Sequence, residues 1–278
     1  MTNIFIEGIQ GSGKSTLLNR IARSNPGMQV CREGDYSPIE LAWCTWMTEE
    51  DYNVVLKRYG AIRDEIISNT FKNIFKGKEY FIITYTRILT DIPGFHKDLE
   101  QYEIYNGRRD FRDFRDIIFL RYKNFNENAA ANFAMNPEAQ GYLFECSFFQ
   151  NIIETLILYY MLSDEEIVDF YRELYHNVKN DDFKLLYLCS DSIEENISNI
   201  KKERCDNQGN EVWYELMLNY LIASPYGQQQ GYSNFEHMIS HFKHRQELEM
   251  RIVRDIIGDK AIVVTAEERD FYGSFIYS

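Results

Sequence analysis

A glycine-rich segment joins a strand pattern to a helix pattern at the start of the chain. Apolar residues alternate from Ile4 to Ile6, the alternation stops at Gly8, and helical spacing of apolar residues runs from Leu17 to Ile21. The intervening residues read G-I-Q-G-S-G-K-S, which satisfies the pattern G-x-x-x-x-G-K-[ST]. A chance match in a glycine-rich turn is the alternative, but such a turn requires neither a strand before it nor a helix after it. The context therefore favours a loop that binds phosphate groups.

Each residue type in this segment has a chemical task in holding a nucleoside triphosphate. Glycines let backbone N–H groups curl around a phosphate, and the start of the following helix adds a partial positive charge. Lys14 would reach the β- and γ-phosphate oxygens, and the Ser15 hydroxyl would ligate Mg²⁺. We therefore expect ATP and Mg²⁺ to bind here, with the nucleotide held by Gly8, Gly11, Ser12, Gly13, Lys14, Ser15 and Thr16.

Five short apolar segments predict buried strands, and helical patterns separate them. This alternation is typical of an α/β fold, and with the loop it predicts a P-loop NTPase with a five-stranded parallel sheet flanked by helices. A further apolar stretch, 80–85, suits a strand or hairpin arm as well as the end of a helix, and the sequence leaves both open. The predicted strands are 4–7, 28–32, 142–146, 184–189 and 261–265.

We expect one P-loop kinase-like domain, 1–278, with a large insertion between its second and third strands. The insertion, 36–140, is far longer than an ordinary crossover connection. Helical patterns at 54–75 and 114–125 predict a folded helical region, and in P-loop kinases this position grips the second substrate. After the third strand a long helical pattern covers 149–178 and includes an S-D-E-E segment at Ser163 that suits a helix start with a capping box. Two segments have the composition of exposed loops, 201–209 and 224–231.

Composition limits the partners and the compartment. The net charge of −13 argues against a nucleic-acid partner and against an anionic membrane surface, because both require basic residues. A small anionic ligand is compatible with it, since a few local cations decide such binding. Five scattered cysteines without C-x-x-C spacing favour a reducing cytoplasm, and the predicted first strand leaves no room for a signal peptide. We expect a cytoplasmic protein that acts on a small molecule, and the sequence leaves a homodimer open.

Two carboxylates follow predicted strands and are expected near the loop, because ligands collect at the carboxyl ends of parallel strands. Glu33 follows the second strand and would position or deprotonate the phosphoryl acceptor; a turn residue that caps a helix is the alternative. Glu145 ends the third strand and would face Mg²⁺; a structural hydrogen bond is the alternative. The sequence favours the functional role for Glu33 and does not separate the two roles of Glu145.

A basic cluster ends the helical pattern after the fourth strand. Its residues, 201–204, read K-K-E-R and lie in a segment, 199–212, that suits a lid over the triphosphate. In this interpretation Arg204 would stabilise the transferred phosphoryl group. Lysine and arginine also favour helix C-termini through the helix dipole, so a purely structural role is equally compatible.

The order of these segments resembles the thymidylate kinase and deoxynucleoside kinase group of P-loop kinases. The resemblance is carried by the glycine-rich loop, R-E-G after the second strand, L-F-E-C-S at the third, and L-Y-L followed by I-K-K-E-R at the fourth. It implies phosphoryl transfer from ATP to a small acceptor that bears a hydroxyl or phosphate, with Glu33 near the acceptor and 201–204 as the lid. The family has arginines where this chain has Cys146 and Asn199.

Three further patterns have two interpretations each. Arginines and aspartates alternate at 109–116, which suits self-paired charges on a helix face or an arginine donated to a substrate phosphate. The segment 85–87 and Asp91 are further candidates for acceptor contacts. Three histidines share one face of a predicted helix: His237, His241 and His244. They could form a metal site, but a partly exposed polar stripe is the better supported interpretation.

Together these observations predict an ATP- and Mg²⁺-dependent kinase for a nucleoside, a nucleotide or a similar small acceptor. The expected catalytic residues are Lys14, Glu33 and Arg204, and the expected metal ligands are Ser15 and Glu145. A nucleotide-dependent ATPase switch that acts on a protein partner is the alternative, although no apolar strand ending in aspartate is visible. A phosphotransferase for an antibiotic or metabolite would differ only in its acceptor. Neither the acceptor nor the choice between ATP and GTP follows from the sequence.

Overall fold

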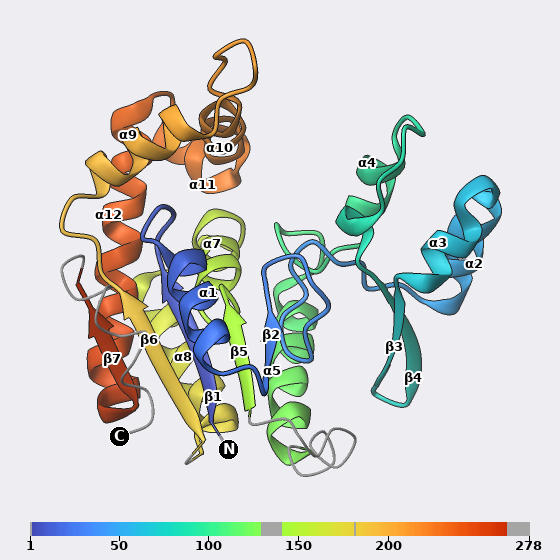
Figure 1. The fold of residues 1–278 in the computed structure, drawn as a ribbon, viewed down its shortest axis with the longest axis horizontal. Coiled ribbons are helices and arrows are strands. Elements are labelled where there is room, and N and C mark those ends of the chain that lie inside the picture. Colours follow the sequence, from blue (N-terminus) through green and yellow to red (C-terminus); the bar gives the residue numbers. More distant parts are fainter. Residues whose placement is uncertain (1, 129–140, 181, 266–278) are drawn as a thin grey trace. The chain divides into compact units, whose positions relative to one another are not determined.

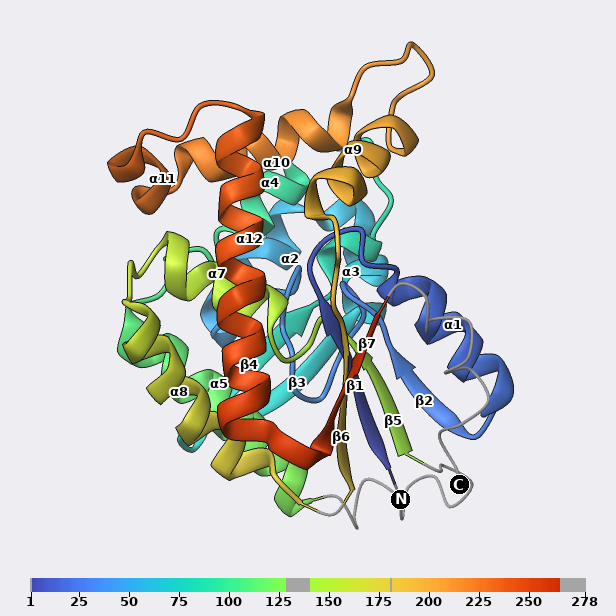
Figure 2. The same cartoon turned by 90° about the vertical axis from the view of Figure 1, so that its left-hand side faces the viewer.

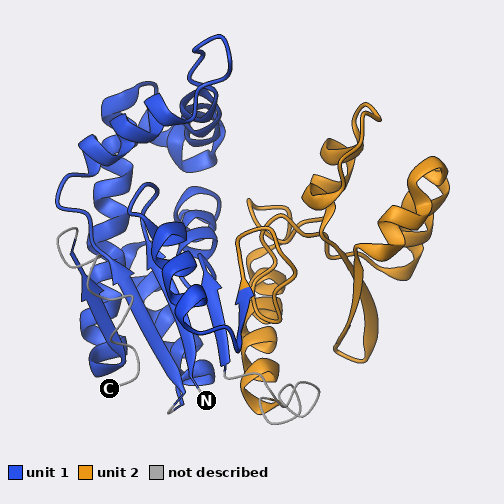
Figure 3. Ribbon diagram, in the orientation of Figure 1, with its two compact units in different colours: residues 1–30, 131–278 blue, residues 31–130 orange. Residues whose placement is uncertain are grey.

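The computed structural model describes residues 2–128, 141–180 and 182–265 (Figure 1). The chain divides into two compact units, coloured separately in Figure 3. Residues 1–30 and 131–278 form the first unit, and residues 31–130 form the second. The second unit interrupts the first between the second and third strands of the sheet, where the sequence predicts an insertion. The last part of the predicted insertion, 129–140, lies outside the described residues.

The first unit is built on a five-stranded parallel sheet with the strand order β2-β5-β1-β6-β7. The predicted α/β fold and its five strands are confirmed. The layout is compatible with that of a P-loop NTPase, because β1 is central and its carboxyl end lies between those of β5 and β6. The strands are β1 (Asn3–Gly8), β2 (Met28–Cys31), β5 (Gly141–Glu145), β6 (Phe183–Leu188) and β7 (Ala261–Val264).

Helices cover both faces of this sheet (Figure 2). On one face Ile4 and Ile6 of β1 pack against α1. On the other, the Phe5 ring lies 4.9 Å from that of Phe183 and 5.9 Å from that of Phe148, and these two rings contact Tyr175 and Tyr171 of α8. Successive side chains of β1 therefore pack into the hydrophobic cores on opposite faces of the sheet. The helices are α1 (Lys14–Ser24), α7 (Gln150–Leu158), α8 (Asp164–Val178), α9 (Ile193–Glu203), α10 (Val212–Ala223), α11 (Pro225–Gln230) and α12 (Phe235–Ile252).

After α12 the chain reaches β7 through two short turns of helix. A π-helical turn covers Val253–Ile257, and a 3-10 turn covers Gly258–Lys260.

The helical pattern at 149–178 forms two helices, α7 and α8. The predicted helix start at Ser163 is confirmed, because Ser163 forms a capping box with Glu166 at the beginning of α8. One prediction for the first unit needs correction. The segment 224–231, predicted as a loop, is mostly α11. Ser224 caps this helix by accepting from the Gly227 N–H, and Pro225 suits its first turn.

The second unit contains a hairpin as well as helices, so the predicted helical insertion is only partly helical. The predicted helix at 54–75 is wrong in its second half, where β3 begins, and the open segment 80–85 is largely β4. Lys76 and Gly77 both have positive φ, which suits a two-residue hairpin turn. The elements are α2 (Glu49–Arg58), α3 (Arg63–Ser68), β3 (Thr70–Phe75), β4 (Lys78–Ile83), α4 (Phe95–Glu100), α5 (Phe111–Glu127) and 3-10 turns at Gly60–Ile62 and Tyr85–Arg87.

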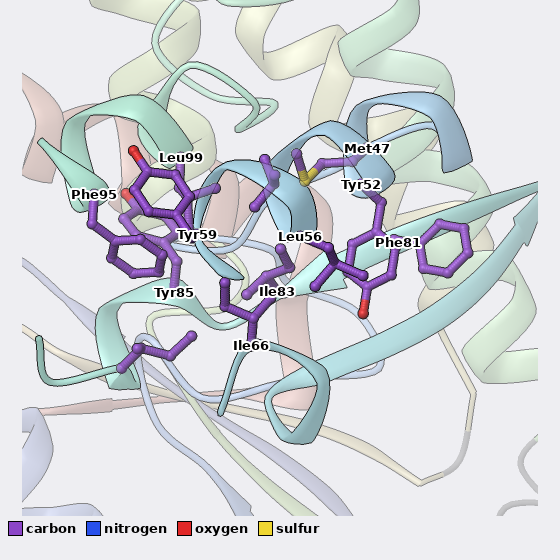
Figure 4. Close-up of a cluster of buried hydrophobic side chains, with 12 residues drawn as sticks. Met47, Tyr52, Leu56, Tyr59, Ile66, Phe81, Ile83, Tyr85, Phe95 and Leu99 are labelled. Carbon is purple, nitrogen blue, oxygen red and sulfur yellow. The ribbon is translucent and has the colours of Figure 1, made fainter. Parts of the chain in front are cut away.

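The second unit has a hydrophobic core of its own (Figure 4). The Tyr52 ring of α2 stacks on the Phe81 ring of β4 at 4.4 Å, and Tyr59 meets Phe95 edge to face at 5.0 Å. Ile66 of α3 is completely buried among them. The core joins α2, α3, α4 and the hairpin into one folded body.

The central position of Phe5 predicts a large loss of stability on truncation. Phe5→Ala should lower the free energy of unfolding by about 3–5 kcal/mol, because the cavity lies between the sheet and its covering helices. Urea denaturation followed by circular dichroism measures this. Leu216→Ala on the exposed side of α10 is the control, with a change within about 0.5 kcal/mol. Equal effects of the two substitutions would contradict this account of the core.

Candidate functional site

The loop between β1 and α1 has a backbone that only glycine allows at its key positions. The φ angles are +139° at Gly8, +77° at Gly11 and +91° at Gly13. A Cβ atom on Gly8 would lie 2.5 Å from the Leu188 carbonyl oxygen of the neighbouring strand β6. Side chains at these positions are therefore excluded by conformation and by space.

The start of α1 is an uncompensated positive end of a helix. Gly13, which has no side chain to offer, is its N-cap, and the first turn contains no acidic residue. The Ser12 hydroxyl is fully buried and finds no hydrogen-bond partner within the described part of the chain. A helix N-terminus in this state attracts anions, because its first N–H groups have no partners within the helix.

Lys14 places its ammonium group within this loop. Its Nζ donates to the carbonyl oxygens of Gly8 at 2.7 Å and Ile9 at 2.9 Å, and the side chain is 8% exposed. A cation held by two neutral carbonyls keeps its full charge for an incoming anion. The loop therefore combines backbone donors, a helix dipole and an ammonium group in one place.

Ser15 and Glu145 meet at the edge of the loop. The Ser15 hydroxyl donates to Glu145 Oε1 at 2.5 Å. Parallel pairing of β1 with β5 sets Glu145 beside Ile6, so the carboxylate leaves the sheet next to the loop. A hydroxyl and a carboxylate oxygen are suitable ligands for Mg²⁺. The structural hydrogen bond considered for Glu145 is present, and it is compatible with a metal role because it brings both candidate ligands together. Thr16 is exposed on the first turn of α1.

Helix α9 packs directly on the loop. A Cβ on Gly11 would lie 2.5 Å from Ile200 Cδ1 and 3.3 Å from the Asn196 carbonyl oxygen. Asn196 is anchored in turn, since its amide donates to the Ser190 hydroxyl at 2.7 Å. An apolar side chain of the predicted lid thus covers the glycine-rich loop.

The basic residues of the predicted lid bind elsewhere in the first unit. Lys201 Nζ lies 3.0 Å from a Glu211 carboxylate oxygen and 4.1 Å from the centre of the Tyr214 ring. The Arg204 guanidinium lies 5.8 Å from the Trp213 ring centre. In this conformation Lys201 and Arg204, which the sequence predicts to contact the triphosphate, instead contact Glu211 and the aromatic rings of α10.

A row of buried charged side chains lies behind the sheet, on α7 and α12. Glu154 accepts from Arg245 at 2.5 Å and pairs with His241 at 2.7 Å. Burial alone would raise the pKa of Glu154, but His241 and Arg245 lower it to about 2. Arg245 Nε also lies 2.9 Å from Glu249 Oε1, and the Tyr187 hydroxyl of β6 donates to Glu249 Oε2 at 2.7 Å. The row is thus an alternating chain of acids and bases without contact to water.

Glu7 extends this buried polar region to the loop. It is the last residue before Gly8 and has no exposed surface. Its Oε1 accepts from the Phe148 N–H at 2.6 Å, whereas its Oε2 has no hydrogen-bond partner among the described residues. Burial raises the pKa of Glu7 to about 7; the Phe148 N–H and Lys14 oppose the rise, and the charge of Glu249 adds to it.

The second unit gathers several of the predicted acceptor residues. The Trp43 indole N–H donates to Glu33 at 3.2 Å, and Arg87 pairs with Asp35. Gly34, between the two acids, lies next to Trp43 and to Thr86 of the same unit. Trp43 is 44% exposed and has a positive φ, an uncommon backbone conformation for a large side chain. Glu33 is thus part of a polar and aromatic cluster with Trp43, Asp35 and Arg87 within the second unit.

Buried Arg121 of α5 supports this part of the second unit. It donates to the Ser37 carbonyl at 2.5 Å and to the Ile39 carbonyl at 3.0 Å, which fixes the segment that follows Glu33 and Asp35.

The remaining candidates have structural partners. Tyr85 is buried and donates to Glu103 at 2.7 Å, while Asp91 is exposed. The predicted ion pairs within 109–116 are not the main contacts of Arg109 and Asp116. Arg109 donates to the Trp46 carbonyl, and Asp116 forms an ion pair with Lys76 at 2.6 Å.

The histidine stripe is not an exposed surface. His241 is fully buried against Glu154, and His244 lies 2.8 Å from Asp164, whereas His237 accepts from the Ser233 N–H. Within residues 2–128, 141–180 and 182–265, no group of three His, Cys, Asp or Glu side chains could hold a metal ion. The predicted partly exposed stripe therefore holds for His237 and His244 but is wrong for His241.

Five residues of these clusters have no predicted role from the sequence: Glu7, Glu154, Arg245, Glu249 and Trp43. For Glu7 a signal existed, because an acid directly before the first glycine interrupts an otherwise apolar strand. The spacing of Arg245 and Glu249 also matches an ion pair within a helix. Their burial, however, depends on α12 packing against the sheet, which no local pattern shows.

Comparisons with known proteins add no assignment. No model of a known protein family matches the chain, and no curated protein matches it. Each helix in the described residues falls short of the length and apolar character needed to cross a membrane.

The environment of Glu7 predicts a pH dependence of stability. An acid with a raised pKa in the folded protein stabilises it fully only below the unfolded-state pKa of 4.5, and that contribution is lost as the pH rises through about 7. Glu7→Gln removes the loss, so the variant should gain stability over the wild type between pH 5 and pH 8, by up to about 3 kcal/mol. Thermal and urea unfolding at pH 5 and pH 8 measure the difference in free energy of unfolding between Glu7→Gln and the wild type. If this difference is the same at both pH values, or reverses, ionisation of Glu7 has no cost in the folded protein.

Proposed function

We propose that this protein is a P-loop phosphotransferase of the nucleoside or nucleotide kinase type, which transfers a phosphoryl group from ATP with Mg²⁺ to a small acceptor. The β1–α1 loop carries the proposal. It combines three positive-φ glycines, a helix start capped only by glycine and an ammonium group at the central strand of a parallel sheet. In open α/β sheets this is where ligands bind.

The residues of the loop divide the work. Backbone N–H groups of the segment from Gly11 to Thr16 would hold the phosphates, and the fully buried hydroxyl of Ser12 would supply one more polar contact. Lys14 would leave the two loop carbonyls and bind the β- and γ-phosphates. Ser15 and Glu145 would hold Mg²⁺, which when bound neutralises charge on the transferred group.

The cluster around Glu33 supports an acceptor site in the second unit. Trp43 offers an exposed ring, Glu33 and Asp35 offer carboxylates, and Arg87 offers a cation. Glu33 would orient the acceptor hydroxyl and accept its proton. The cations 201–204 would stabilise the transferred group only after leaving their partners on α10, so Arg204 is proposed as a residue that moves.

An ATPase switch with a protein partner has less support than a kinase. A kinase needs a second site that binds a small molecule, and the Glu33 cluster supplies carboxylates, a ring and a cation in one place. A phosphotransferase for an antibiotic or another metabolite would use the same residues. The choice among these acceptors is an outcome of the following experiment.

ADP release from ATP and Mg²⁺ should rise strongly with one class of acceptor. The panel comprises nucleosides, nucleoside monophosphates, aminoglycosides and sugars. Lys14→Ala should lower the acceptor-dependent rate by roughly 100-fold or more, because the charge on the migrating phosphoryl group loses its cation. Lys243→Ala, on the exposed side of α12, is the matched control and should keep the wild-type rate. ATP binding without stimulation by any acceptor would contradict the kinase and favour a switch.

Glu33→Gln should lower kcat by roughly 100-fold and KM for the acceptor by much less, because the amide keeps the shape but does not accept the proton. Glu65→Gln, exposed on α3 of the same unit, is the control. Steady-state kinetics with the best acceptor separates the two parameters. An unchanged kcat would remove Glu33 from the reaction and leave it as a partner of Trp43.

A further inference from the structure

The surroundings of the Glu7 carboxylate stabilise its ionised form only weakly. Glu7 is completely buried at the base of the proposed phosphate loop, where the backbone N–H of Phe148 donates to its Oε1 at 2.6 Å and the N–H of Phe149 contributes more weakly. Its second oxygen, Oε2, faces no donor in the described part of the chain. A buried ionised carboxylate normally requires a paired cation or several hydrogen bonds.

The charged groups around Glu7 give it little compensation. Lys14 of α1 attracts it, but the ammonium is engaged by the Gly8 and Ile9 carbonyls. Glu249 of α12 repels it. Arg245 of α12 already lies between two acids, Glu249 and Glu154.

Hydroxyl and backbone groups complete these surroundings. Tyr187 of β6 pairs with Glu7 in the sheet register but donates its hydroxyl to Glu249. From the segment leading into α7, the N–H of Phe149 adds a weak favourable contribution to that of Phe148. Within the described surroundings, Lys14 is therefore the cation that favours the charge of Glu7.

Binding of a triphosphate to the loop would increase the repulsion of the Glu7 charge and decrease its attraction to Lys14. The new negative charges lie at the loop that begins one residue after Glu7, and they repel its carboxylate. Lys14 would at the same time turn toward the phosphates, so its attraction for Glu7 weakens. Both effects favour the neutral acid.

We propose that Glu7 takes up a proton when the triphosphate of ATP occupies the β1–α1 loop, so that ATP binding weakens as the pH rises. The proton comes from solvent and binds the Oε2 atom, which then becomes an O–H donor. The inference rests on the proposed function, because it needs an anion in the loop. Glu7 would act as a coupling residue that touches neither ATP nor the acceptor.

The thermodynamic consequence is specific. At pH 6 Glu7 is already largely protonated without ATP, given its pKa of about 7, so binding takes up little proton. At pH 8 the wild type must bind a proton together with ATP, and its affinity should be roughly tenfold lower than that of a protein with a permanently neutral side chain. General damage to the loop would change affinity in the opposite direction.

Isothermal titration of ATP with Mg²⁺ into the full chain tests this. Titrations at pH 7.5 in buffers of different ionisation enthalpy give the protons taken up per ATP. The wild type should take up roughly 0.5–0.8 proton more than Glu7→Gln, whose amide keeps the bond from Phe148. Glu7→Gln should also bind ATP about tenfold more tightly than the wild type at pH 8 and equally at pH 6. Glu195→Gln, exposed on α9, is the matched control and should behave as the wild type.

Each outcome has one meaning. Equal proton uptake by wild type and Glu7→Gln, with ATP bound by both, would overturn the inference and leave the proposed function intact. Weaker binding by a folded Glu7→Gln at pH 8 would also overturn it, because Glu7 would then help to hold ATP. If neither folded protein binds ATP, the proposed function fails and the inference fails with it.

Discussion

The parallel pairing of β1 with β5 on one side and β6 on the other is the constraint on which the candidate site depends. Its register places Glu145 beside Ile6, and so beside the loop in which Ser15 begins α1. On the other side it places the Leu188 carbonyl where a side chain at Gly8 would lie. A shift of either strand by one residue would turn these groups to the opposite face of the sheet. The loop geometry is therefore a property of three strands and not of the loop alone.

The charged side chains of α7 and α12 that are buried against the sheet lose their contact with water, and the ion pairs among them offset this loss. Glu154 pairs with Arg245 and His241, and Glu249 has Arg245 and Tyr187 as partners, so one guanidinium is shared by two buried carboxylates. Apolar residues of similar volume could replace such a row with little loss of stability. Its position next to Glu7 gives it a second consequence. Because Arg245 is engaged by two acids, Lys14 is the cation that favours the charge of Glu7, and the buried row is thereby connected to the β1–α1 loop.

The sequence predicts best those features that local spacing determines. The five strands and the loop follow from alternation and from one short motif, because each is complete within a few residues. The hairpin was missed in part because Phe71, Ile74 and Phe75 also fit helical spacing, and only the turn at Lys76 and Gly77 distinguishes the two. Pairs such as Glu154 with Arg245 join residues far apart in the chain, so their burial appears only in the folded structure. The partners of Lys201 and Arg204 are close in sequence, but these contacts depend on how α10 folds back beside the end of α9.

We propose that the loop, Ser15 and Glu145 together hold ATP with Mg²⁺. Equilibrium binding of ATP to the wild type, with Mg²⁺ and with a chelator, tests it most directly when compared with Ser15→Ala. The account predicts that Mg²⁺ strengthens ATP binding to the wild type by roughly tenfold or more, and that Ser15→Ala largely loses this effect while still binding metal-free ATP. An equal effect of Mg²⁺ on both proteins, or no binding of ATP to the wild type, would contradict the account.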